Sequence, residues 1–212
     1  MGNHALVEGG KGAMTVYLFT GTPGSGKSLH MARLIYWRQR RGIPTIANFD
    51  IRKECINEGY FESIDNGDLT PQVLQDFALD AYERNLCKRR EGAVNLFIDE
   101  CQLLFNARQW NDSKRPDWIK FFSQHRKLGF DVYLISQFDT MIDKQIRALI
   151  EYEVKHRKMN NYGRIGRFVG FITRKPVIVC VNYWYPMGQR LSSETFVGTK
   201  RYFEMYDTNK IF

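Results

Sequence analysis

The sequence predicts an α/β fold in which helices flank a central, mostly parallel sheet, and three observations lead to that class. Short apolar runs at residues 15–19, 93–98 and 131–136 have the composition of buried strands. Segments with helical periodicity separate these runs, as expected when parallel strands alternate with crossover helices. Residues 21–28 fit the phosphate-binding pattern G-x-x-x-x-G-K-[ST] between the first strand and the first helix. The chain is therefore predicted to be a P-loop NTPase.

The glycine-rich loop supplies the nucleotide hypothesis. Its glycines let successive backbone N–H groups turn toward phosphates without a Cβ clash, and the helix at residues 29–41 adds its positive dipole end. Lys27 is expected to reach the β- and γ-phosphates of ATP, and the Ser28 hydroxyl to ligate Mg²⁺. A glycine-rich turn that matches by chance is the alternative, which the flanking strand and helix disfavour. The predicted nucleotide-binding residues are Gly21, Thr22, Pro23, Gly24, Ser25, Gly26, Lys27, Ser28 and Leu29.

Two elements are expected between the phosphate loop and the next motif. Gly42 is a stop signal for the first helix, and residues 44–49 after it are predicted to form a second strand. Thr70 and Pro71 open an amphipathic helix that is predicted to run to about Arg90, where a short basic turn ends it. These elements would supply one strand of the sheet and one of its covering helices.

The apolar run at residues 93–98 ends in Asp99 and Glu100, so a buried strand is expected to deliver two carboxylates to its tip. Asp99 is the candidate Walker-B acid, which would hold Mg²⁺ directly or through water. Glu100 would polarise the attacking water, and a carboxylate at this place distinguishes hydrolases from most nucleotide kinases of the P-loop class. Two exposed acids that cap a strand are the alternative, which the upstream phosphate loop disfavours.

The strand at residues 131–136 ends at Gln137 and sets the expected strand order. In P-loop ATPases with a catalytic glutamate after the Walker-B aspartate (the ASCE class), the strand that follows inserts between the two motif strands, so its tip faces the γ-phosphate. Gln137 is therefore a candidate sensor of the γ-phosphate or of the lytic water, with an exposed polar strand end as the alternative. Two helical pieces, broken around residues 112–116, are expected to precede this strand.

Length and composition predict one domain of 212 residues with three parts. Residues 1–13 are expected to be a disordered leader, a vector remnant or an upstream start, residues 14–150 the ATPase core, and residues 151–212 a β-rich part with a hairpin appendage. Four cysteines without a C-x-x-C pair predict free thiols in a reducing cytosol. The longest apolar run near the C-terminus, residues 177–181, is too short to span a bilayer, so the chain as given is expected to be soluble.

The formal net charge of +8 is concentrated in one segment. Between residues 147 and 175 eight basic residues face two acidic ones, and Tyr152, Tyr162 and Phe168 are interleaved with them. This composition is typical of a surface that meets single-stranded DNA or an anionic membrane, and a solvated hairpin face is the alternative. The basic residues are Arg147, Lys155, Arg157, Lys158, Arg164, Arg167, Arg174 and Lys175.

Three sequence blocks resemble the zonular occludens toxin (Zot) family. They are the phosphate loop, residues 97–100 (FIDE) and, most specifically, residues 123–137 (SQHRKLGFDVYLISQ). The resemblance covers residue 14 to about the end of the chain. The family includes the gene I assembly and export ATPases of filamentous phages and is related to the FtsK/HerA group of DNA-pumping ATPases.

The resemblance implies a cytoplasmic, multimeric ATPase domain, which in the full-length protein is followed by a membrane-spanning helix and an extracytoplasmic tail. It also implies a location at the cytoplasmic face of the host membrane. Family members are thought to drive virion extrusion, so the implied partners are further copies in a ring and phage coat and envelope assembly proteins. A FtsK/HerA-like DNA translocase and a nucleotide-dependent assembly scaffold without significant hydrolysis are the alternatives. Glu100 speaks against the scaffold.

Hydrolysis in a ring calls for an arginine from a neighbouring subunit, because neutralising the charge that develops on the γ-phosphate is worth about 10³- to 10⁵-fold in rate. Arg126, in the most family-specific block, and Arg147, after the sensor strand, are the candidates. A surface ion pair within one chain is the alternative for each.

No catalytic or metal-binding role is predicted for the histidines or for two of the tryptophans. Histidine at a helix end more often packs or caps than binds metal, and the remaining histidines show no ligand spacing with His125. The tryptophans are expected to anchor core or interface packing. The residues concerned are His4, His30, His125, His156, Trp110 and Trp118.

Overall fold

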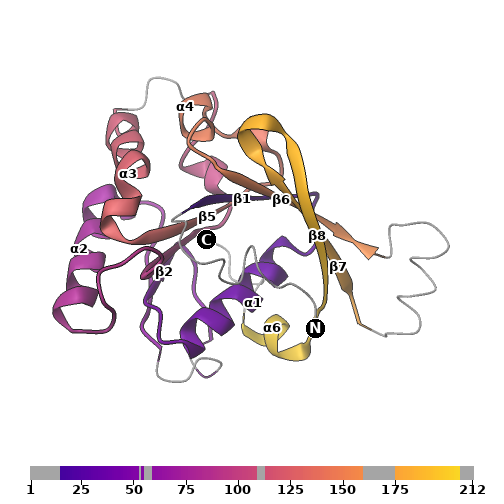
Figure 1. Ribbon diagram of the computed structural model, residues 1–212, viewed down its shortest axis with the longest axis horizontal. Helices are drawn as coiled ribbons and strands as arrows, with labels where there is room; N and C mark the ends of the chain where they lie inside the picture. Colours follow the sequence, from indigo (N-terminus) through magenta and orange to yellow (C-terminus); the bar gives the residue numbers. More distant parts are fainter. Residues whose placement is uncertain (1–14, 53, 55–58, 109–112, 160–174, 206–212) are drawn as a thin grey trace.

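Eight strands form one sheet in the part of the chain that the structure describes, with helices on both of its faces (Figure 1). The strands are β1 (Val16–Thr20), β2 (Thr45–Ala47), β3 (Phe61–Ser63), β4 (Val94–Ile98), β5 (Phe130–Ile135), β6 (Tyr152–Lys158), β7 (Val177–Trp184) and β8 (Gln189–Val197). The helices are α1 (Lys27–Arg40), α2 (Pro71–Glu83), α3 (Arg115–Leu128), α4 (Lys144–Arg147) and α6 (Lys200–Met205). Short 3₁₀ helices are η2 (Cys101–Leu103), η3 (Asp139–Met141) and η5 (Tyr185–Met187). None of the described helices combines the length and the hydropathy that a membrane span requires.

This computed structural model describes residues 15–52, 54, 59–108, 113–159 and 175–205. Several features expected from the sequence lie outside the described residues, among them the leader at residues 1–13. The others are His4, Trp110, Tyr162, Arg164, Arg167, Phe168 and Arg174.

The strand order β3-β2-β4-β5-β1-β6-β7-β8 places β5 between β4 and β1. This is the insertion predicted for a P-loop ATPase with a glutamate after its Walker-B aspartate. The first six strands in the chain pair in parallel, and Leu134 of β5 pairs with both Leu18 of β1 and Ile98 of β4. All three side chains are fully buried, which explains why these strands are almost continuously apolar in sequence.

The expected C-terminal hairpin consists of β7 and β8, which pair antiparallel. It continues the main sheet, because β6 pairs in parallel with β1 on one side and antiparallel with β7 on the other. The strand that leads into the phosphate loop therefore has the C-terminal part of the chain as its immediate neighbour.

The sheet separates two apolar cores, which its helices cover from opposite faces (Figure 1). Successive residues of a strand point to opposite faces, so Leu18 belongs to one core and Phe19 to the other. The core of Leu18 includes Phe121 of α3, and the core of Phe19 includes Leu34 of α1 and Tyr133 of β5. Both faces of the central strands are thus dry, which fixes their register.

The prediction that the helix beginning at Pro71 reaches Arg90 is wrong, because α2 ends at Glu83. Asn85 adopts a left-handed conformation with φ of 57°, and the Leu86 N–H donates to the Ala81 carbonyl. This arrangement is a Schellman-type cap, which terminates a helix without a glycine when asparagine takes the left-handed position.

Candidate functional site

Four polar segments meet at one edge of the sheet because they follow four parallel strands. The phosphate loop follows β1, Asn48 follows β2, Asp99 follows β4, and Gln137 comes two residues after β5. Parallel strands present their carboxyl ends at a common edge, which is where open α/β sheets bind ligands. The topology alone therefore assembles residues that lie far apart in the sequence.

The phosphate loop takes a backbone conformation that needs glycine at defined positions. Gly24 and Gly26 have φ of 73° and 101°, in the region that L-residues other than glycine avoid. A Cβ added to Gly26 would lie 2.5 Å from Cδ1 of the buried Ile178, whereas one added to Gly24 would meet no described atom within 4 Å. The Ser25 N–H donates to the Thr22 carbonyl at 3.0 Å, which closes the loop. The loop thus packs against Ile178 of β7 at Gly26, whereas there is free space next to Gly24.

Lys27 connects the loop to the carboxylate pair. Its Nζ donates to the Gly21 carbonyl at 2.7 Å and to the Thr22 carbonyl at 3.4 Å, and only 8% of the residue is exposed. Burial lowers the pKa of Lys27, and the charges of Glu100 and Asp99 act in the opposite direction. The ammonium group is therefore within electrostatic reach of both carboxylates. The expected contact of Lys27 with the β- and γ-phosphates stays a prediction.

The Asp99–Glu100 turn holds its two carboxylates in different environments. Asp99 is 7% exposed, and its Oδ1 accepts from the Glu100 N–H at 2.9 Å. Glu100 has φ of 46°, a left-handed conformation that costs about 1–3 kcal/mol in a residue with a side chain. Its carboxylate accepts a short hydrogen bond from Nε2 of Gln102 in η2. The backbone at this turn is thus strained, and a neighbouring amide orients the candidate catalytic carboxylate.

Asn48 is a site residue that the sequence did not reveal. Its Nδ2 donates to the Asp99 carbonyl at 2.9 Å and to Oδ1 of Asn66 at 2.8 Å, and its Oδ1 accepts from the Asp99 N–H at 2.7 Å. The side chain is 4% exposed, so it fixes both backbone groups of Asp99 in a dry environment. The only available signal was a polar residue near the end of the predicted strand at residues 44–49.

Gln137 lies beside the phosphate loop, just beyond the carboxyl end of β5. Its backbone carbonyl accepts from the Gly21 N–H at 3.2 Å. It helps to line a pocket of about 470 Å³ together with Thr22 of the loop and Glu153 of β6. The predicted position of Gln137 at the site is therefore found, and its role as a sensor stays a prediction.

A second pocket, of about 340 Å³, lies on the α1 side of the loop. Its lining includes the loop from Gly24 to Leu29, and its far wall is formed by Pro176, Tyr202 and Phe203. Figure 1 shows α6, which carries the two aromatic residues, beside α1. No sequence pattern predicted that α6 lies beside the phosphate loop, because its position depends on the whole C-terminal part of the sheet.

The two candidate arginines have partners within their own chain. Nη2 of Arg126 donates to Oε1 of Glu151 at 2.8 Å, and this pair lies where β5 and β6 begin, at the end of the sheet opposite the phosphate loop. Nη1 of Arg147 reaches the carbonyl of Asp139 at 3.5 Å, and Asp139 helps to line the pocket of Gln137. Action of either arginine on a neighbouring subunit stays a prediction.

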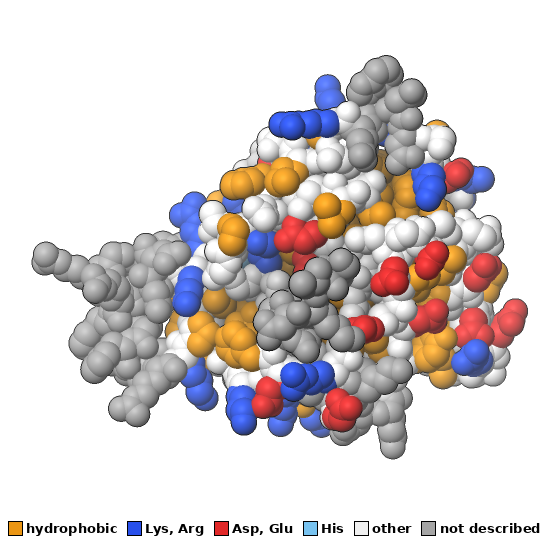
Figure 2. Space-filling view, turned by 180° about the vertical axis from the view of Figure 1, so that it is seen from behind, with side chains coloured by type: hydrophobic (Ala, Val, Ile, Leu, Met, Phe, Trp, Pro, Cys, Tyr) orange, Lys and Arg blue, Asp and Glu red, His pale blue; other side chains and the backbone are white. Residues whose placement is uncertain are grey.

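Charged side chains are unevenly distributed on the face that Figure 2 shows. On this face many Lys and Arg side chains lie toward the side that carries β6 to β8 and along the lower rim, and most Asp and Glu side chains lie toward the opposite side. Nζ of Lys155 is 3.4 Å from Oε2 of Glu153, and it also lies 5.0 Å from the Tyr183 ring centroid. One lysine of the predicted basic surface is thus paired with an acid of its own strand.

The packing roles inferred for two other residues agree with their surroundings. Trp118 is 4% exposed and stacks edge-on against Phe105 and Phe121. His125 is 5% exposed, and its Nδ1 bonds to the Phe122 carbonyl one turn earlier in α3. Both residues serve the core around α3.

The comparisons with known proteins agree with this geometry. The sequence matches the family described as Zonular occludens toxin (Zot) over residues 15–207. The Gene 1 protein of Enterobacteria phage fd is 33% identical over 162 residues, which cover 69% of this chain and 43% of that protein. The N-terminal domain of zonular occludens toxin from Neisseria meningitidis has a TM-score of 0.55 at 19% identity, covering 92% of this chain and 100% of that one. The genome packaging NTPase B204 from Sulfolobus turreted icosahedral virus 2, in complex with ATP-gammaS, has a TM-score of 0.54 at 11% identity, covering 85% and 96%.

These likenesses carry different conclusions. The two solved structures establish the fold alone, and with the strand order and the phosphate loop it is that of a P-loop NTPase. The chain spans less than half the length of the phage fd protein. The family match extends over nearly all of the sequence, and so the chain belongs to the Zot family.

Proposed function

We propose that this chain is the ATP-hydrolysing motor domain of a filamentous-phage assembly and export protein. The observation that carries the proposal is the position of Lys27, which bonds the backbone of the phosphate loop while lying within electrostatic reach of Asp99 and Glu100. A buried lysine between a glycine loop and two carboxylates is the arrangement that phosphoryl transfer requires.

The residues fit ATP and Mg²⁺ by their chemistry. Positive φ at Gly24 and Gly26, with open space over Gly24, leaves backbone N–H groups free to cradle phosphate oxygens. The hydroxyl of Ser28 and the carboxylate of Asp99 are oxygen ligands of the kind that Mg²⁺ prefers. When bound, the metal would neutralise charge on the phosphates.

Each side chain would then have one task. Lys27 would release the carbonyls of Gly21 and Thr22 and bind the β- and γ-phosphates. Glu100 would accept a proton from the attacking water, and the Gln102 amide would hold its carboxylate in place. Gln137 would sense the γ-phosphate from the tip of β5.

The pocket on the α1 side would hold the base of the nucleotide. Tyr202, Phe203 and Pro176 offer flat apolar surfaces beyond the loop residues that would hold the phosphates, and 52% of Phe203 is exposed. Such surfaces suit the face of a purine ring, for which stacking on an aromatic residue is worth about 1–3 kcal/mol.

The wider role rests on the family. The Gene 1 relative and the Zot match support an assembly motor in a filamentous phage, working as a ring with phage coat and envelope proteins at the cytoplasmic face of the host membrane. In that ring Arg126 or Arg147 of one subunit would complete the site of the next. The basic side that carries β6 to β8 favours one further candidate, a motor that contacts single-stranded DNA directly.

Phosphate release from ATP, measured against protein concentration, tests the proposal, with Lys27→Ala as the blank. A rate per subunit that rises with concentration supports a ring in which a neighbour supplies an arginine. Glu100→Gln should retain ATP binding and lose turnover. Equal turnover in wild type and Glu100→Gln would contradict the assigned chemistry, and absence of turnover at every concentration would favour a scaffold.

Two further arms separate the motor from its alternatives. Stimulation of turnover by single-stranded DNA that disappears at high salt would favour direct DNA contact. Arg126→Ala and Arg147→Ala should each bind ATP normally, and the true trans-acting arginine should be the one whose loss abolishes hydrolysis.

A further inference from the structure

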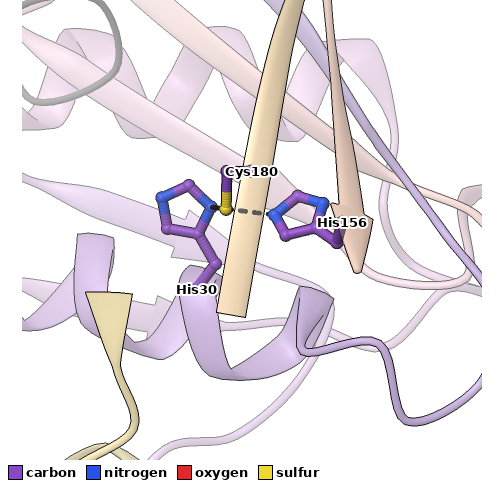
Figure 3. Close-up of side chains that lie close together, drawn as sticks. All are labelled: His30, His156 and Cys180. Atoms are coloured by element: carbon purple, nitrogen blue, oxygen red, sulfur yellow. Dashed lines mark hydrogen bonds between the residues drawn. The ribbon is translucent and has the colours of Figure 1, made fainter. Parts of the chain in front are cut away.

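Three residues with metal-binding side chains meet in the core behind the phosphate loop. His30 lies in the first turns of α1, His156 in β6 and Cys180 in β7, and their side chains point toward one another (Figure 3). His156 and Cys180 are direct partners in the antiparallel β6–β7 ladder, so both project from the sheet face that α1 covers. None of the three is more than 2% exposed.

The ligand atoms are spaced as a small coordination site would need. Nδ1 of His30 lies 3.5 Å from Sγ of Cys180 and 2.8 Å from Nε2 of His156, and the three ligand atoms lie within 4.8 Å of one another. In a tetrahedral zinc site with bonds of about 2.0 Å to nitrogen and about 2.3 Å to sulfur, nitrogen and sulfur ligands are about 3.5 Å apart and two nitrogens about 3.3 Å apart. Binding an ion therefore requires the two imidazoles to separate by about 0.5 Å.

The hydrogen bond on the far side of His156 orients its ring for this purpose. Nδ1 of His156 lies 3.2 Å from the carbonyl of Thr20, which can only accept, so Nδ1 carries the proton. Its Nε2 therefore carries the lone pair, which accepts from Nδ1–H of His30 at 2.8 Å. Binding of an ion would release this proton and the thiol proton of Cys180 to solvent. A backbone carbonyl that fixes the tautomer of a histidine in this way is the usual outer contact of a metal ligand.

We propose that His30, His156 and Cys180 form a buried binding site for one thiophilic d¹⁰ metal ion, Zn²⁺ or Cu⁺. Two imidazole nitrogens and a thiolate form a ligand set that binds Zn²⁺ and Cu⁺ in preference to Mg²⁺ and Ca²⁺. Phe19 stacks on His30 at 4.9 Å and Phe196 lies 5.1 Å from it, so an apolar wall surrounds the site. Ions that demand water ligands are thereby disfavoured.

The position of the site gives it a structural consequence for the phosphate loop. His156 is tied to Thr20, directly before the loop, and His30 lies two residues beyond Ser28 at its end. An ion held by these residues joins β6 and β7 to both flanks of the loop. Metal-loaded protein is therefore more resistant to unfolding than metal-free protein, by an amount set by ion concentration and affinity.

Metal content of the full chain tests the proposal, because it does not depend on ATP turnover. The chain is unfolded and refolded without oxygen in the presence of Zn²⁺ in one arm and Cu⁺ in the other, and the bound metal is counted after gel filtration. Wild type and the matched control Cys87→Ser, which changes a free cysteine outside the cluster, are expected to hold one ion per chain in the arm of the preferred metal. Cys180→Ser should bind about tenfold more weakly or worse.

Cobalt supplies the spectroscopic readout. Refolding with Co²⁺ should give a thiolate-to-cobalt absorption band in wild type and Cys87→Ser that Cys180→Ser lacks. If Cys180→Ser does not fold, His156→Gln replaces it, and the band should weaken or shift because a nitrogen ligand is lost. Substoichiometric metal in both arms, or equal metal content in wild type and the ligand variants, would show that the cluster is only a hydrogen-bonded imidazole pair and overturn the site.

Discussion

Replacement of Asn48 by alanine tests whether a side chain that follows β2, three strands away from β1 and its phosphate loop, holds the Asp99 turn in place. The change removes the donor to the Asp99 carbonyl and the acceptor for the Asp99 N–H, at 2.9 and 2.7 Å. Both backbone groups would remain in an environment where Asn48 itself is only 4% exposed. An unsatisfied buried polar group costs about 1–3 kcal/mol, so Asn48→Ala, which leaves two such groups, should destabilise the fold by about 2–6 kcal/mol. That is a large share of a typical domain stability of about 5–15 kcal/mol.

The matched control is Asn66→Ala, which removes only the 2.8 Å bond between the two asparagines and leaves the contacts with Asp99 intact. Urea unfolding followed by tryptophan fluorescence gives the free energy of unfolding of each variant at an unchanged m-value. Phosphate release should fall in Asn48→Ala and change little in Asn66→Ala. A loss below about 0.5 kcal/mol in Asn48→Ala, or a loss equal to that of the control, would refute the assignment of Asn48 as the residue that positions Asp99.

Three other changes have outcomes that the structure fixes in direction. Gly26→Ala should lose ATP binding and about 1–3 kcal/mol of stability, since its Cβ would meet the buried side chain of Ile178. Gly24→Ala has a strained backbone but free space for its Cβ, so calorimetry should show a smaller loss of stability. In metal-free protein, burial lowers the pKa of His156 to about 4, so the unfolded chain takes up the proton first as pH falls. Its free energy of unfolding should therefore drop by up to about 3 kcal/mol between pH 6.5 and pH 4, and His156→Gln should show a flatter profile in urea titrations with a chelator present. Arg38→Met removes the guanidinium group that lies 3.4 Å from Asp131, a carboxyl group whose pKa burial raises to about 6. The change should lower the free energy of unfolding by about 3 kcal/mol at pH 7 and by less at pH 5, where Asp131 is protonated. Equal losses of stability at the two pH values would contradict this pairing.

The sequence predicted those parts of the fold that local patterns determine. The phosphate loop, the strand ending at Asp99 and the insertion of β5 between β4 and β1 all followed from short motifs in a known order. The true end of α2 was missed because it depends on a left-handed Asn85, a conformation that residue type allows but does not require.

The missed site residues share a different cause. Asn48 meets Asp99 across 51 positions of sequence, because β2 pairs with β4. Tyr202 reaches the loop, and Cys180 reaches His30, only because β6 and β7 extend the sheet beyond β1. Such contacts depend on strand order at the sheet edge, on which the histidine and cysteine spacing carries no information.

The left-handed backbone of Glu100 and the carboxylate of its side chain favour different residue types at this position. Glycine or asparagine would adopt the φ of 46° at this position with less strain, so the stability of the fold alone would disfavour a glutamate there. The catalytic use of the carboxylate that we propose would oppose that selection. Relatives that keep an acid at this turn should therefore be those that still hydrolyse nucleotide, and relatives that carry glycine or asparagine should bind ATP without turnover. If Glu100 has the catalytic role that we propose, the residue at this position should distinguish family members that hydrolyse nucleotide from those that only bind it.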